Sequence, residues 1–273
     1  KVQSELAGLN LESGAIGEVI AQLTKVMATV KDVALLEDIR YQLASAHFKD
    51  NDYKSAVDQF EGMLVDYPAS KLLARILFHA GECRLGLKDN AAAHDHFSAA
   101  SKISGTPETL AESVSMRLAE TQANNGQHAE AKETYAAFLG RFTESRWRRN
   151  AIFGLALATE MAGDPALAIP EYRKLMAAAT VDLWTVRSRY QIGRCQVSLK
   201  QYEAAVVEFV SIEINYPQYP LWQARSILEV GKLLMEQNKT TQAVAQFKTV
   251  IKRFKESEEA TLAQNYIKQI NSQ

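Results

Sequence analysis

The sequence lacks an excess of charge of one sign, a long apolar run and recognisable strand patterns. Its 31 basic and 32 acidic residues leave a formal net charge of −1, whereas nucleic-acid-binding proteins more often carry a strong basic excess. No apolar segment reaches the length of a transmembrane helix. We therefore expect no nucleic-acid partner and no transmembrane segment. Hydrophobic residues make up 47% of the chain, which is enough for a continuous helical core.

The motifs of common catalytic sites are missing as well. The chain has no glycine-rich phosphate loop, no HExxH motif and no CxxC motif. His94 and His96 are two residues apart on a predicted helix, so their side chains point away from each other and make a poor metal-binding pair. We therefore expect a protein that is not an enzyme and that has no cofactor or metal site.

What the sequence does contain is a repeat with a period of 37 or 38 residues in six copies. One column of the repeat is aromatic, the residue four positions earlier is always alanine, and the residue sixteen positions before the aromatic is always small. A fixed period of this length indicates an array of helical repeats. The aromatic column is Phe60, Phe97, Tyr135, Tyr172, Phe209 and Phe247; the alanine column is Ala56, Ala93, Ala131, Ala168, Ala205 and Ala243; the small column is Ala44, Gly81, Ala119, Ala156, Gly193 and Gly231.

Two helices per copy explain the spacing of these columns. Twelve residues separate each small residue from the alanine of its copy, which is too far for one face of a short helix. The distance fits a helix, a tight turn and a second helix, which we call helix A and helix B. A small residue at their crossing lets the two backbones approach closely, and the aromatic side chain fills the space beside it.

The best-preserved copies resemble the tetratricopeptide repeat. The first full copy carries residues typical of that family: Leu43-Ala44, Tyr53, Ala56, Phe60 and Tyr67-Pro68. The resemblance implies an all-α fold, a right-handed α-solenoid of antiparallel helix pairs that binds partners on its concave face. The period is longer than the usual ~34 residues. The tyrosine position is replaced in four copies, by Asn90, His128, Pro165 and Thr240.

Extending the register predicts a single solenoid domain over residues 1–273. An imperfect repeat with Leu6-Ala7 and Leu23 at its key positions occupies residues 1–31, and six repeats occupy residues 32–255. A polar capping helix follows over residues 256–273, giving about fifteen helices in seven pairs plus the cap. Terminal helices of this kind keep a repeat array soluble.

Pro170 lies inside the predicted helix B of the fourth full copy. A proline there removes one backbone hydrogen bond and crowds the carbonyl group of Ala166. We therefore expect this helix to bend or to shift its hydrogen bonds there, and the curvature of the array to change between the fourth and fifth copies.

The compartment is left open by two opposing signals. The long period and the Tyr-Pro endings are similar to those of bacterial envelope proteins, such as the Tol–Pal-associated periplasmic coordinator and the lipoprotein of the outer-membrane β-barrel assembly machinery. This likeness favours the periplasm or cell envelope over the cytoplasm. Cys83 and Cys195 weigh against it, because six helices separate them and a disulfide needs Cα atoms within ~7 Å. We expect both to be buried core residues, and unpaired thiols are not typical of secreted proteins.

The resemblance also implies which helix A residues line the concave groove. The positions three before the small residue form an apolar and aromatic ladder, and nearby positions are acidic in the second and third copies and basic in the fifth and sixth. An alternative is that the ladder packs between neighbouring A helices. The predicted groove residues are Tyr41, Phe78, Met116, Phe153 and Tyr190 in the ladder, the acidic Glu82 and Glu120, and the basic Arg187, Arg194, Arg225 and Lys232.

Three tryptophans form another column, which has two interpretations. Trp147, Trp184 and Trp222 follow the same period at the start of helix A. They could form a recognition strip for a ligand, or each ring could pack on the preceding copy. Leucine stands in this column in earlier copies, at Leu35, Leu72 and Leu110, and favours packing.

These features predict a non-catalytic scaffold that binds a peptide or protein segment in its groove. Basic side chains in the fifth and sixth copies favour an acidic partner, and we expect them to project toward one region of the concave face. Two alternatives remain: a module that assembles with itself into a homo-oligomer or assists assembly, and the binding part of a larger enzyme or receptor. The sequence does not identify the partner.

Overall fold

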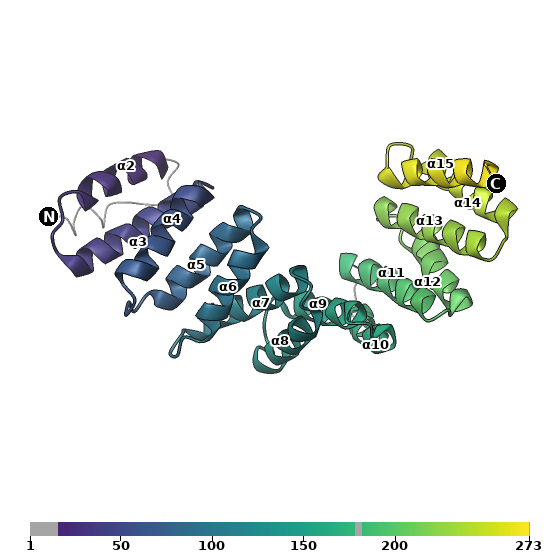
Figure 1. The fold of residues 1–273 in the computed structure, drawn as a ribbon. Coiled ribbons are helices and arrows are strands. Elements are labelled where there is room, and N and C mark those ends of the chain that lie inside the picture. The colour runs from purple at the N-terminus through teal and green to yellow at the C-terminus, as the bar shows by residue number, and fades with distance from the viewer. Residues whose placement is uncertain (1–15, 178–181, 273) are drawn as a thin grey trace. The chain divides into compact units, whose positions relative to one another are not determined.

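In the computed structural model, residues 16–177 and 182–272 are described, and they form fourteen helices and no strand (Figure 1). The first helix of the predicted N-terminal repeat, around Leu6-Ala7, lies outside these residues. The helices are α2 (Ile16–Met27), α3 (Val33–Lys49), α4 (Tyr53–Asp66), α5 (Leu73–Gly86), α6 (Asn90–Ser101), α7 (Glu108–Asn124), α8 (His128–Arg141), α9 (Arg148–Met161), α10 (Pro165–Met176), α11 (Leu183–Ser198), α12 (Tyr202–Asn215), α13 (Pro220–Glu236), α14 (Thr240–Arg253) and α15 (Glu258–Asn271).

The helices group into two compact units, residues 1–134 and 135–273, with the boundary inside α8. In the first unit each helix from α2 to α7 packs against the next one, and in the second unit the same holds from α9 to α15. Four pairs of described helices that are two apart in the chain also contact each other: α3 and α5, α9 and α11, α11 and α13, and α13 and α15. This arrangement confirms the predicted all-α fold of stacked helix pairs. None of the helices in the described ranges is long and apolar enough to cross a membrane.

The repeat columns form the core of each unit. All six residues of the alanine column are 0% exposed, and the aromatic column is between 0% and 4% exposed. The glycines of the small column lie directly under the aromatic rings. A Cβ atom added to Gly193 would stand 2.6 Å from the ring of Phe209, and one added to Gly231 would stand 2.5 Å from the ring of Phe247. Helices A and B therefore approach each other closely at the small residue, as the spacing of the repeat columns predicts.

The turn between helices A and B has the same conformation in all six copies, and the sequence did not reveal this. One residue in each turn has a positive φ: Asn51, Lys88, Gly126, Gly163, Lys200 and Asn238. The N–H of the following residue then donates to a carbonyl five residues earlier, as from Gln201 to Gln196 at 2.8 Å. This is the Schellman ending of a helix, which favours glycine at the left-handed position.

Replacing Lys200 with glycine should therefore stabilise the protein. Lys200 has a φ of +58°, and its Cβ makes this conformation unfavourable, so Lys200→Gly should raise the free energy of unfolding by about 0.5–1 kcal/mol. Urea-induced unfolding followed by circular dichroism measures the gain. Lys200→Ala removes the charge but keeps the Cβ, so an equal gain from that variant would contradict the backbone explanation.

Pro170 does not interrupt its helix. α10 runs as one α-helix from Pro165 to Met176 with Pro170 inside it, and the expected bend or shift of hydrogen bonds at Pro170 stays a prediction. A proline costs one hydrogen bond, whereas packing of α10 against both α9 and α11 holds the segment helical. The predicted change in curvature stays a prediction.

Cys83 and Cys195 are both free, and both side chains are 0% exposed. Each belongs to the core of its own unit, Cys83 beside Phe60 and Cys195 beside Tyr172. Burial raises the pKa of both thiols to about 12, so neither is a reactive thiolate near neutral pH. The prediction that they are core residues is confirmed.

Candidate ligand-binding pocket

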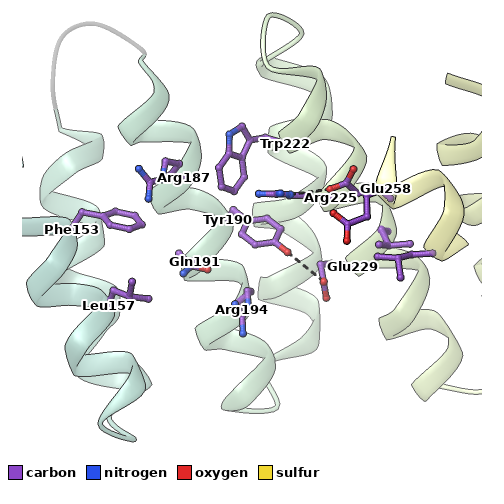
Figure 2. A pocket seen from close by; sticks show the side chains of 13 residues that line it. Phe153, Leu157, Arg187, Tyr190, Gln191, Arg194, Trp222, Arg225, Glu229 and Glu258 are labelled. Carbon is purple, nitrogen blue, oxygen red and sulfur yellow. Dashed lines mark hydrogen bonds and ion pairs between the residues drawn. The ribbon is translucent and has the colours of Figure 1, made fainter. Parts of the chain in front are cut away.

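The second unit contains a pocket of about 400 Å³ lined by four helices, α9, α11, α13 and α15 (Figure 2). Three of them are A helices of successive copies and the fourth is the capping helix. Its walls combine aromatic, basic and acidic side chains. The lining residues are Phe153, Leu157, Arg187, Tyr190, Gln191, Arg194, Trp222, Arg225, Leu228, Glu229, Glu258, Glu259 and Leu262.

One face of α11 supplies the largest part of the basic wall. Arg187, Tyr190, Gln191 and Arg194 line the pocket together, because residues three, four and seven positions apart share one face of a helix. Ile192 and Cys195 lie on the opposite face of α11 and are buried. α11 therefore presents one face to the pocket and the other to the core of the unit.

Arg187 is held over two aromatic rings. Its guanidinium carbon lies 4.3 Å from the centre of the Phe153 ring and 4.9 Å from that of Trp184. These cation–π contacts fix the side chain in one place. Burial lowers the pKa of Arg187 below its ordinary value, although an arginine remains protonated at neutral pH.

Arg187 and Arg194 have no carboxylate partner in the described part of the chain. Arg194 is exposed, and neither guanidinium forms an ion pair there. Other arginines of the same unit do: Arg149, Arg189, Arg225 and Arg253. The amide oxygen of Gln191 between them is buried and accepts no hydrogen bond from the described residues. This wall therefore offers two positive charges and one acceptor to a ligand.

Glu229 of α13 is paired with neighbouring side chains of the protein. The hydroxyl group of Tyr190 donates to Glu229 at 3.3 Å, and Lys232 donates to the same carboxylate at 2.8 Å. Lys232 is not among the residues that line the pocket. In the structure its amine is held by Glu229, and its place in the basic region of the groove stays a prediction.

Arg225 is neutralised by the capping helix. Its Nε donates to Oε1 of Glu259 at 3.0 Å, and its guanidinium carbon lies 5.1 Å from the centre of the Trp222 ring. Glu259 is only 5% exposed, and its Oε2 has no hydrogen-bond partner among the described residues. Sequence reasoning missed this wall of Glu258, Glu259 and Leu262. The acidic first turn of α15 was the signal that could have found it.

The aromatic ladder both packs and lines the pocket in this unit. Phe153 is 6% exposed, and its ring centre lies 5.4 Å from that of Tyr172 and 5.5 Å from that of Trp184. Tyr190 lies 5.6 Å from Phe209 in the same way. The ladder positions are therefore mostly packing residues whose edges reach the pocket (Figure 2).

The tryptophan column divides between its two interpretations. Trp184 is packed against the core of Phe153 and Tyr172. Trp222 packs against Tyr190 with ring centres 5.3 Å apart and also lines the pocket. Trp147 is half-buried and lies under the guanidinium of Arg146 at 4.6 Å. Only Trp222 is placed to contact a ligand in this pocket.

The predicted groove residues of the first unit lie mainly in packing contacts. The rings of Tyr41 and Phe78 lie 5.8 Å from Phe60 and Phe97 respectively, and Met116 is 5% exposed. Each of these side chains therefore fills space between helices.

The two acidic residues predicted for the groove share one arginine. Arg117 contacts Glu82 at 2.7 Å and Glu120 at 2.8 Å. One arginine therefore balances one of these two negative charges within the protein, and the charge separation along the groove stays a prediction.

Comparison with known proteins bears on the fold. Residues 113–145 and 225–257 match the family described as tetratricopeptide repeat. A tetratricopeptide repeat protein from Parabacteroides merdae is 14% identical and superposes with a TM-score of 0.68 over 86% of this chain and 87% of that one. The C-terminal part of a TPR repeat-containing protein from Cytophaga hutchinsonii is 20% identical, with a TM-score of 0.62 over 85% and 88%.

A third similar structure is YrrB, described as a TPR protein with an unusual peptide-binding site. It is 14% identical, with a TM-score of 0.50 over 76% of this chain and 97% of that one. No curated protein is significantly similar in sequence. At these identities the likeness concerns the fold, and the ligand has to be inferred from the pocket itself.

Proposed function

We propose that this chain, two segments of which match the tetratricopeptide repeat family, is a non-catalytic scaffold whose pocket between α9, α11, α13 and α15 binds an acidic segment of a protein partner. The observation that carries this proposal is the pair of arginines on α11. Arg187 and Arg194 line the pocket without a carboxylate partner among the described residues.

The environment of Arg187 favours an anionic ligand. Removing a guanidinium from water without a counter-charge is costly, and the lowered pKa of Arg187 reflects this cost. A carboxylate of the ligand would offset it, because the planar guanidinium matches a carboxylate in geometry. The rings of Phe153 and Trp184 already hold Arg187 in place, so little side-chain entropy is lost on binding.

Other features of the pocket favour a peptide over a small anion. Leu262 of α15 is 41% exposed, and Trp222 of α13 is half-buried and also lines the pocket, so apolar side chains of a ligand have surfaces to cover. The buried oxygen of Gln191 needs a donor, which a peptide N–H supplies and an acetate ion does not. A polypeptide segment provides a carboxylate, apolar side chains and N–H groups together.

Selection from a random dodecapeptide phage library tests this proposal. Peptides selected on the full chain should be enriched in Asp and Glu, and synthetic versions should bind roughly tenfold or more weakly to the Arg187→Glu/Arg194→Glu variant. Fluorescence anisotropy measures the affinities. The control is Arg173→Glu/Lys248→Glu, two exposed positions of the same unit with the same change in charge, which should bind like the wild type.

Two results would overturn the proposal. Selected peptides without acidic residues, or bound equally by the pocket and control variants, would place binding elsewhere. A second copy of the chain is the other possible occupant. If light scattering shows a concentration-dependent dimer that only the Arg187→Glu/Arg194→Glu variant loses, the pocket serves self-assembly instead.

A further inference from the structure

The pocket has a positive and a negative wall. Arg187 and Arg194 stand on α11, while Glu258 and Glu259 stand on α15, with α13 between them (Figure 2). Glu258 is exposed and has no ion-pair partner in the described part of the chain. The two walls therefore present opposite charges to one ligand.

The negative wall has a buried acceptor that the protein does not use. Glu259 is 5% exposed, and Arg225 donates only to its Oε1. Its Oε2 is buried without a partner among the described residues. An unpaired buried carboxylate oxygen is unfavourable, and a cationic group entering the pocket beside Glu258 would satisfy it.

The charged residues of α13 that line the pocket between the two walls are already paired within the protein. The α11 and α15 walls are therefore the parts of the pocket that can bind charged groups of a ligand. Glu229 is held by Tyr190 and Lys232, and the guanidinium of Arg225 is held by Glu259. The middle of the pocket is therefore close to neutral and is lined by Trp222 and Leu228. A ligand that carried only negative charge would meet repulsion from α15.

We infer that the ligand is bipolar: its acidic residue contacts Arg187 and Arg194, and a basic residue of the same segment contacts Glu258 and Oε2 of Glu259. This inference rests on the proposed function and adds a specificity rule to it. Glu258 and Glu259 are specificity-determining residues of the pocket.

Helix spacing gives the separation of the two charges in the ligand. α11 contacts α13, and α13 contacts α15, and packed helices lie about 8–10 Å apart. The two walls are therefore separated by about 16–20 Å. An extended chain covers about 3.3–3.6 Å per residue, so the acidic and basic residues should stand roughly five or six positions apart.

Charge reversal at Glu258 tests this rule in the full chain. Peptides selected on the wild type should carry a basic residue roughly five or six positions from the acidic one, in either direction. Replacing that basic residue by alanine should weaken binding up to about fivefold, as expected for one exposed ion pair. Peptides selected on Glu258→Lys should carry an acidic residue at that place instead.

Glu203→Lys is the matched control. Glu203 is exposed and, like Glu258, lies in the first turn of its helix, so both reversals oppose a helix dipole to a similar degree. Circular dichroism melting verifies folding of both variants. Glu258→Gln is a milder second variant, in which alanine substitution of the peptide's basic residue should have a smaller effect than in the wild type.

The outcomes separate this inference from the proposed function. Peptides that need Arg187 and Arg194 but show no basic residue, or that bind Glu258→Lys and Glu258→Gln as tightly as the wild type, overturn the bipolar rule and leave the acidic-peptide pocket in place. Peptides that bind without Arg187 and Arg194 overturn both.

Discussion

Replacing Phe209 with alanine should lower the free energy of unfolding by about 3–5 kcal/mol, the range found for large buried aromatic residues. Phe209 is 0% exposed and packs with Ala205, Val230 and Leu233. Its ring also covers Gly193 at the crossing of helices A and B. Truncation leaves a cavity where α11, α12 and α13 meet, and the glycine has no side chain to fill it.

Urea-induced unfolding of the full chain, followed by circular dichroism, measures this loss. The control is Val207→Ala on the same helix. Val207 is 66% exposed, so its truncation should change the free energy of unfolding by less than about 0.5 kcal/mol. Equal losses for the two variants would show that the aromatic column is not the main support of the helix crossing.

A second large effect is expected from acidification, through His79. This side chain lies among Tyr41, Phe48, Phe60 and Phe78, and its ring stacks on that of Phe60 at 5.5 Å. Burial, with a smaller contribution from the charge of Arg75, lowers the pKa of His79 to about 4. The imidazole is therefore neutral in the folded protein, while the unfolded chain binds a proton near pH 6.5.

The difference in the pKa of His79 between the folded and unfolded protein sets the direction in which stability changes with pH. Stability from the lowered pKa is present above about pH 6.5 and is lost as the pH falls from there toward about 4. By pH 5 the wild type should have lost about 2 kcal/mol through this residue relative to pH 7.5. The neutral variant His79→Leu should show a correspondingly flatter dependence in urea unfolding at several pH values. If the free energy of unfolding fell equally with pH in the wild type and in His79→Leu, His79 would not be the source of the effect.

The core could be predicted from the sequence because it repeats. Each alanine and aromatic of the columns is buried in every copy, so the pattern of one helix pair predicts the core of all six. The boundaries followed from the same register: the capping helix was expected from residue 256 and begins at Glu258. Lys88 and Lys200 gave no such signal, because lysine rarely adopts a positive φ and only the shared register places it at the left-handed position.

The charge pattern was harder to predict, because ion pairs form between helices. Arg117 and Glu82 are 35 residues apart, and Arg225 and Glu259 are 34 apart, so both pairs join neighbouring A-type helices. A list of charges on one helix face cannot reveal which of them are already neutralised. The structure leaves Arg187 and Arg194 unpaired among the described residues, whereas Arg225 is paired with Glu259 and Lys232 with Glu229.

The charge swap between peptide and pocket tests the central claim most directly. A library-selected peptide and a version with its acidic residue replaced by lysine are titrated against the wild type and the Arg187→Glu/Arg194→Glu variant. If the pocket binds an acidic segment through these arginines, the lysine peptide will bind the reversed variant more tightly than the wild type, and the original peptide will do the opposite. Binding of the original peptide to both proteins with equal affinity, with no gain from the swap, would contradict the account.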